Sequence, residues 1–219
     1  MNRPDDLILP HGGYRKLRSF AVALAAYDGT VIFCDRFIDK RSRTHDQMVQ
    51  AARSGVQNIA EGSLASGTSK KTEIKLTNVA RASLGELIRD YEDYLRQHQL
   101  PIWDKNSPRV RAMRARLAGQ SKAPVHPLLP PATNRSEFFD EPLLAALHAL
   151  QAAAAEVCAN IMPCLTNQAS YLLGRQLRRL EGDFVQKGGF TERLYQYRKD
   201  YRDGKVGESE TLYSQTSDF

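Results

Sequence analysis

The sequence lacks the features that mark secreted, membrane-spanning and zinc-binding proteins. Its three cysteines, Cys34, Cys158 and Cys164, are odd in number and form no CxxC pair, which argues against a disulfide framework or a zinc knuckle. No segment approaches the roughly 20 apolar residues that span a bilayer, so we expect no transmembrane helix. The first ten residues lack an apolar core of signal-peptide length. These absences predict a cytoplasmic protein with no membrane partner.

Motifs of catalysis are also missing. The five histidines form no HExxH motif and no i, i+4 pair, so the sequence predicts no metal ligand. Residues 62–71 approach the phosphate-binding pattern GxxxxGK[ST], but Thr68 stands where the lysine belongs and a helix is expected where a strand is required. No nucleophile–base spacing and no carboxylate pair stands out. We therefore expect a protein that is not an enzyme, with no catalytic residue and no cofactor.

Long amphipathic segments are what the sequence does contain. Apolar residues recur at steps of three and four over residues 14–39, 69–98 and 161–184, which is the spacing of helices packed in a bundle. The first two segments would be about 39 and 45 Å long at 1.5 Å per residue. Matched lengths and short connections are what an up-down bundle requires. The predicted fold is all-α: an antiparallel up-down four-helix bundle with an insertion between its third and fourth helices and a short C-terminal helix.

The predicted domain organisation follows from proline, glycine and charge. Residues 14–103 should form the first three bundle helices, and residues 104–142 a basic, proline-rich insertion with seven cationic and three anionic side chains across 99–140. Residues 143–203 should hold the fourth bundle helix and the C-terminal helix, and residues 204–219 a disordered tail. A helix that begins at residues 140–142 should be alanine-rich through Ala155, Pro163 should kink or restart it, and Gly188 should end the fourth helix.

Residues 42–62 read as a short helix between sharp ends. Thr44 and Gln47 have capping-box spacing, and Gly62 stands where a left-handed C-terminal residue is expected. Small residues, Gly55 among them, should let a neighbouring backbone approach closely. The opposite side carries a polar stripe that is either a solvated surface or a subunit interface: Asp46, Gln50, Arg53, Gln57 and Glu61.

The end of this helix, residues 58–62 (Asn-Ile-Ala-Glu-Gly), resembles a family of bacterial four-helix-bundle proteins. Those proteins are encoded within intervening sequences of large-subunit ribosomal RNA genes, and the accessory protein of diversity-generating retroelements is similar to them. Residues 167–173 and 188–194 resemble the longer form with a C-terminal suffix domain. The resemblance implies a homopentamer, nucleic-acid binding and a possible reverse-transcriptase partner; no catalytic residue is known for the family. The positions that carry it are Thr44, Gln47, Arg53, Asn58, Glu61 and Gly62.

Cationic clusters are the remaining functional signal in a chain of net charge +6. Three lysines crowd a helix N-terminus, where anionic side chains are normally favoured, and four arginines crowd the insertion: Lys70, Lys71, Lys75, Arg109, Arg111, Arg114 and Arg116. Without aromatic residues between them, contact with RNA or DNA should be mainly to phosphates. Two hypotheses therefore stay open: an oligomeric nucleic-acid-binding or reverse-transcriptase-accessory protein, or an assembly or adaptor module that binds another protein.

Overall fold

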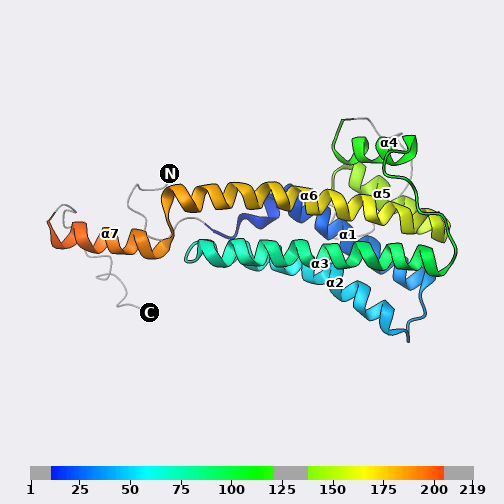
Figure 1. The fold of residues 1–219 in the computed structure, drawn as a ribbon, viewed down its shortest axis with the longest axis horizontal. Coiled ribbons are helices and arrows are strands. Elements are labelled where there is room, and N and C mark those ends of the chain that lie inside the picture. Colours follow the sequence, from blue (N-terminus) through cyan, green and yellow to red (C-terminus); the bar gives the residue numbers. More distant parts are fainter. Residues whose placement is uncertain (1–10, 121–137, 205–219) are drawn as a thin grey trace, which may run out of the picture.

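The computed structural model describes residues 11–120 and 138–204, and within these ranges the chain is helical and contains no strand (Figure 1). This confirms the prediction of an all-α fold. The expected disordered tail and most of the proline-rich loop lie outside the described residues. The elements in chain order are η1 (Gly13–Lys16), α1 (Arg18–Phe37), α2 (Arg43–Ala65), α3 (Lys70–Gln97), α4 (Pro108–Leu117), α5 (Glu141–Ala152), α6 (Ala155–Lys187) and α7 (Phe190–Arg202).

The four longest helices lie side by side around one hydrophobic core. Helix α1 packs against α2 and α6, and α3 packs against the same two helices (Figure 1). Their apolar stripes point inward, as the three-and-four spacing predicts. The largest fully buried side chains from α1, α2 and α3 are Phe33, Met48, Leu84, Leu87, Tyr91 and Leu95. None of the helices in the described part of the chain is long and apolar enough to cross a membrane.

The ends of the first two helices differ from expectation. Leu17 has extended backbone, so the predicted continuous helix over 14–39 is divided into η1 and α1. Helix α2 is capped by Ser42, whose hydroxyl accepts from the Thr44 amide, so Thr44 is inside the helix and the predicted capping box is wrong. Gly62 also lies within α2, which continues to Ala65. A Cβ on Gly62 would lie 3.3 Å from Leu76 Cβ, so this glycine serves close packing on α3.

The break between the fifth and sixth helices comes earlier in the sequence than Pro163, where the sequence predicts a kink or restart. Helix α5 ends at Ala152, α6 begins at Ala155, and α6 runs through Pro163 to Lys187. A proline inside a helix removes one backbone hydrogen bond, but the residues on both sides of it, Met162 and Cys164, are buried and hold the helix in place. The expected restart at Pro163 is therefore wrong: the chain divides between Ala152 and Ala155.

The remaining helices lie at the two extremities of the bundle. Helices α4 and α5 cover one end of α6, where α5 also packs on α1 (Figure 1). Asp140 caps α5, so the predicted domain boundary at residue 142 falls inside that helix. At the other extremity α6 ends at Gly188, whose φ of 64° is favourable for glycine. Helix α7 then projects beyond the bundle (Figure 1).

Candidate nucleic-acid interface

The lysine cluster lies at the start of α3, where Ser69 caps the helix by accepting from the Thr72 amide. Lys70 Nζ lies 2.8 Å from the Glu73 carboxylate, and the two side chains are only 22% and 10% exposed. An ion pair this well covered is a structural contact, since separating it would leave the Glu73 charge poorly solvated. Lys70 is therefore engaged within the fold, whereas Lys71 and Lys75 are exposed.

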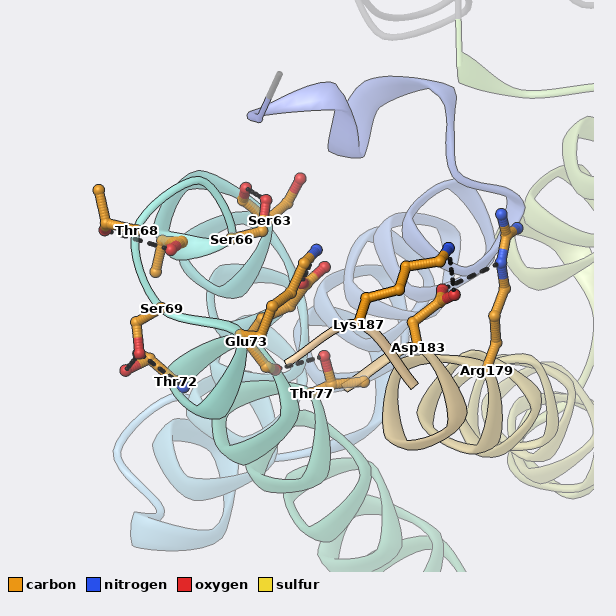
Figure 2. Close-up of polar contacts among 12 residues, drawn as sticks. Ser63, Ser66, Thr68, Ser69, Thr72, Glu73, Thr77, Arg179, Asp183 and Lys187 are labelled. Atoms are coloured by element: carbon orange, nitrogen blue, oxygen red, sulfur yellow. Dashed lines mark hydrogen bonds and ion pairs between the residues drawn. The ribbon is translucent and has the colours of Figure 1, made fainter. Parts of the chain in front are cut away.

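The turn between α2 and α3 uses its hydroxyls locally. Ser66 donates to the Ser63 carbonyl at 2.7 Å, and the Ser69 and Thr72 hydroxyls lie 2.8 Å apart, as Figure 2 shows. Thr77 donates to the Glu73 carbonyl at 2.8 Å. The segment that approaches the phosphate-loop pattern is therefore the last turn of one helix followed by the capped start of the next. The Ser66 and Ser69 hydroxyls satisfy helix ends, which otherwise leave orphan backbone groups, and Thr77 bonds back within α3.

The end of α6 lies beside the start of α3. Asp183 on α6 contacts Lys187 at 2.9 Å and Arg179 at 3.9 Å (Figure 2). The hydrogen bond from Lys187 lowers the pKa of this exposed carboxyl, and the positive charges of Lys187, Arg179 and Lys70 act in the same direction. Lys70 on α3 thus helps to lower the pKa of Asp183 on the neighbouring helix α6.

A second contact joins the two helices farther along. A Cβ built on Gly174 would lie 3.8 Å from Arg81 Cζ, so the Arg81 side chain of α3 lies against α6 at this glycine. Arg178 is four residues from Gly174 and therefore shares its side of α6, whereas Arg175 points about 100° away from Gly174 around the helix. We call the exposed residues Lys71, Lys75, Arg81, Arg175 and Arg178 the α3–α6 basic face.

Charge is unbalanced along this part of the molecule. Residues 70–81 carry four cationic and one anionic side chain, and residues 174–187 carry four cationic and two anionic ones. Sequence reasoning found the lysines but missed the arginines of α6, which are about one hundred residues away in the chain. The available signal was the spacing of Arg175, Arg178 and Arg179 at i, i+3 and i+4, which becomes meaningful only once the two helices are paired.

The arginine cluster is a separate feature. Helix α4 lies toward the extremity of the bundle opposite the start of α3, so the structure does not bring the predicted lysines and arginines together (Figure 1). The Arg109 guanidinium stacks over the Trp103 ring at 4.5 Å, and Arg114 donates to the Lys105 carbonyl. Arg111 and Arg116 are exposed. Half of this predicted cluster is therefore occupied with contacts inside the fold.

Trp103 adjoins an apolar cleft between α4, α5 and α6. Its indole N–H donates to Glu156 Oε1 at 3.1 Å, and its backbone N–H donates to Asn160 Oδ1 at 2.8 Å. These two bonds attach the α3–α4 connection to α6. The cleft has a volume of about 370 Å³ and is lined mainly by apolar side chains, among them Met113, Leu117, Ala146 and Ile161, with Arg109 and Arg116 also on its lining.

The conspicuous residues of α2 divide into exposed and structural groups. Arg53, Gln57 and Glu61 are exposed, as the polar stripe predicts, and Thr44 and Gln47 are exposed as well. Asn58 bonds back to the Ser54 carbonyl at 2.8 Å. A Cβ on Gly55 would lie 2.9 Å from Leu84 Cδ2 of α3. The small residues are therefore used for packing inside one chain, and they do not by themselves indicate contact between subunits.

The cysteines are among the ionisable groups buried in the described part of the chain. The three cysteines are buried free thiols, and burial raises the pKa of each, that of Cys34 to about 12. A thiol with a raised pKa is a poor nucleophile at neutral pH. Across residues 11–120 and 138–204, no group of three or more His, Cys, Asp or Glu side chains is placed to hold a metal ion.

The chain was compared with protein-family models, with curated proteins and with solved structures, and none of the three comparisons gives a match.

Proposed function

We propose that this protein is a non-enzymatic, homo-oligomeric up-down four-helix bundle that binds nucleic acid through the phosphates. The observation that supports this proposal most is the α3–α6 basic face: the paired helices α3 and α6 carry the exposed cations Lys71, Lys75, Arg81, Arg175 and Arg178, and Arg81 lies against Gly174 of α6. Phosphate neutralisation by such a surface releases condensed counterions, which gives sequence-independent binding that weakens steeply with salt. Proximity to a reverse transcriptase, as the family resemblance implies, would supply the nucleic acid.

The test is fluorescence anisotropy with labelled oligonucleotides of unrelated sequence between 50 and 300 mM salt. The double change Lys71→Ala and Lys75→Ala should weaken binding to all sequences about equally and reduce the salt slope by roughly two. The double change Arg175→Ala and Arg178→Ala should act in the same way. Arg111→Ala with Arg116→Ala removes the same charge from exposed positions on α4 and is the matched control. Equal effects of all three pairs, or no binding at micromolar protein, would count against the proposal.

Oligomerisation has an independent measurement. Light scattering on the purified protein should give a mass several times the 24.6 kDa of one chain, and the family resemblance implies five copies. An oligomer would repeat the basic face around an axis and so raise the effective concentration of weak phosphate contacts. A monomer at micromolar concentration would contradict both the proposed pentamer and the proposed multivalent binding.

The adaptor alternative has an observation of its own. The cleft at Trp103 presents apolar lining between three helices, and helix-in-groove recognition uses such surfaces. Its test is a pull-down with the neighbouring gene products, a reverse transcriptase included, comparing the wild type with Met113→Glu and Ala146→Glu. Loss of a partner in these variants, with nucleic-acid binding unchanged, would favour the adaptor function over the first proposal.

A further inference from the structure

Most side chains of helix α7 are exposed, and its composition is unusual for a surface. It has no buried residue, and three of its thirteen residues are tyrosines whose exposed fractions are 70% at Tyr195, 37% at Tyr197 and 67% at Tyr201. Aromatic side chains normally supply buried area. Exposed rings on a regular helix therefore indicate a contact surface.

Two of the tyrosines belong to a stripe that follows the helical repeat. Phe190, Leu194, Tyr197 and Tyr201 are separated by four, three and four residues and so share one side of α7. Tyr197 and Tyr201 are one turn apart, which places them about 6 Å apart along the helix axis. Successive planar rings at that spacing can stack on successive unpaired bases, because each base offers a flat face whatever its identity.

The charges of α7 complement a polyanion. It carries four cations, Arg193, Arg198, Lys199 and Arg202, against two carboxylates. Both carboxylates have contacts within the helix. Glu192 accepts from the Gly189 backbone N–H at 2.8 Å, part of the backbone hydrogen bonding that lowers its pKa, and Asp200 accepts from Gln196 Nε2 at 2.8 Å. The cations are thus in excess, and pairing two copies of α7 would bring like net charges together.

The position of α7 extends the basic face. Helix α7 leaves the extremity of the bundle where α6 ends and α3 begins, as Figure 1 shows. Only Gly188 and Gly189 separate it from α6. A chain of nucleotides that contacts Lys71 and Lys75 would need to pass only the end of α6 to reach the tyrosines.

We propose that α7 is a stacking platform and that the ligand of this protein is single-stranded nucleic acid. This inference rests on the proposed function and adds its substrate class. The α3–α6 basic face contacts phosphates, which a duplex also presents, whereas the tyrosines need bases that are not already stacked and paired in a duplex. The strand preference therefore comes from α7.

The experiment compares a single-stranded 20-mer, its duplex and an abasic 20-mer by anisotropy at fixed salt. Wild-type protein should prefer the single strand to both others. Changing Tyr197 and Tyr201 together to Leu should lower single-strand affinity roughly tenfold or more, since one base–aromatic stack contributes about 1–3 kcal/mol. Duplex and abasic affinities and the salt slope should not change. Changing the same two residues to Phe keeps the rings and should retain the preference.

The matched control is Tyr171→Leu, which removes a ring that is 58% exposed on α6, away from α7. Circular dichroism and the melting temperature report folding, and light scattering reports assembly. Equal affinity of the wild type for all three ligands, or a loss in the Phe variant as large as in the Leu variant, would overturn the platform while leaving salt-dependent phosphate binding intact. A lower oligomer mass in the Leu variant without altered strand preference would assign the stripe to self-association. No binding to any ligand would overturn the proposed function with it.

Discussion

The hydroxyl of Tyr91 on α3 donates a 3.0 Å hydrogen bond to Thr30 Oγ1 on α1, at a position where both side chains are fully buried. Thr30 in turn donates to the Ala26 carbonyl at 2.7 Å, so its only proton is committed to that bond. Burial raises the pKa of the Tyr91 phenol well above its ordinary value and keeps it a donor. The Tyr91–Thr30 bond thus connects two diagonally opposed helices through the core.

The direction of this chain predicts an asymmetry between its two ends. Tyr91→Phe removes the donor and leaves Thr30 still bonded to Ala26, so it should cost about 0.5–1.5 kcal/mol of unfolding free energy. Thr30→Val leaves the buried phenol without an acceptor and should cost about 1–3 kcal/mol. Urea denaturation measures both. The double variant should be less destabilised than the sum of the two singles, because the residues share one interaction. An additive double variant would show that they are uncoupled.

Two helical glycines should respond oppositely to alanine. A Cβ on Gly29 would lie 2.8 Å from both Leu150 Cδ1 and Met162 Sδ, so Gly29→Ala should overpack the core and cost about 1–3 kcal/mol. Gly85 has nothing within 4 Å of the same position, so Gly85→Ala should stabilise α3 by up to about 1 kcal/mol through helix propensity. Thermal unfolding distinguishes them. A higher melting temperature for Gly29→Ala would contradict the close contact at Gly29, and a lower one for Gly85→Ala would contradict the open space at Gly85.

Arg36 should stabilise the junction of α5 and α6. Its guanidinium donates to the Leu150 carbonyl and, at 2.9 Å, to the Ala153 carbonyl, and it lies 4.4 Å from the centre of the Phe37 ring. Arg36→Lys keeps the charge but loses the fork that reaches two carbonyls, so it should still cost about 1–3 kcal/mol. Hydrogen exchange should show faster opening of α5 with little change in α3. Wild-type protection of α5 in the lysine variant would argue against this role.

Much of the fold could be predicted from sequence because side-chain periodicity records it. The apolar stripes of α1, α3 and α6 and the Gly188 stop lie where the sequence predicts them. The division between α5 and α6 could not be predicted. It falls in a run of alanines that carries no local signal and coincides with the carbonyls bound by Arg36, which is more than one hundred residues away in the sequence.

The candidate site was less predictable, since it depends on which distant residues become neighbours. The spacing of Lys70, Lys71 and Lys75 suggested one cluster of three, but the ion pair to Glu73 removes Lys70 from it. Arg175 and Arg178 join the remaining lysines only through the pairing of α3 with α6. The arginines of α4 looked equally suitable in sequence, and only the Trp103 contact distinguishes Arg109 from the exposed Arg111.

Stability should fall as the pH rises above about 9. Burial raises the pKa of Cys34 to about 12, with the charges of Asp35 and Asp90 acting in the same direction. An unfolded thiol ionises near its ordinary value of roughly 8.5. Between these values the native state keeps a proton that the unfolded state has lost, so the stability that is fully present at lower pH declines. Urea midpoints at pH 8 and pH 10 measure the decline, and Cys34→Ala should reduce it. An unchanged decline in that variant would assign it to other groups.

Substitutions of two adjacent lysines at the start of α3 should have different effects on stability and on nucleic-acid binding. Lys70 pairs with the nearly buried Glu73 at 2.8 Å. Lys70→Ala therefore leaves the Glu73 carboxylate without its cationic partner and should cost about 1–3 kcal/mol of unfolding free energy. Lys71 is exposed, so Lys71→Ala should leave stability within about 0.5 kcal/mol of the wild type. The expected order reverses for nucleic acid: at 100 mM salt, Lys71→Ala should weaken binding more than Lys70→Ala. Lys70→Ala with Glu73→Gln removes both charges and should recover much of the lost stability. If Lys70→Ala instead leaves the urea midpoint unchanged and weakens binding as much as Lys71→Ala does, Lys70 belongs to the basic face and its ion pair does not determine its role.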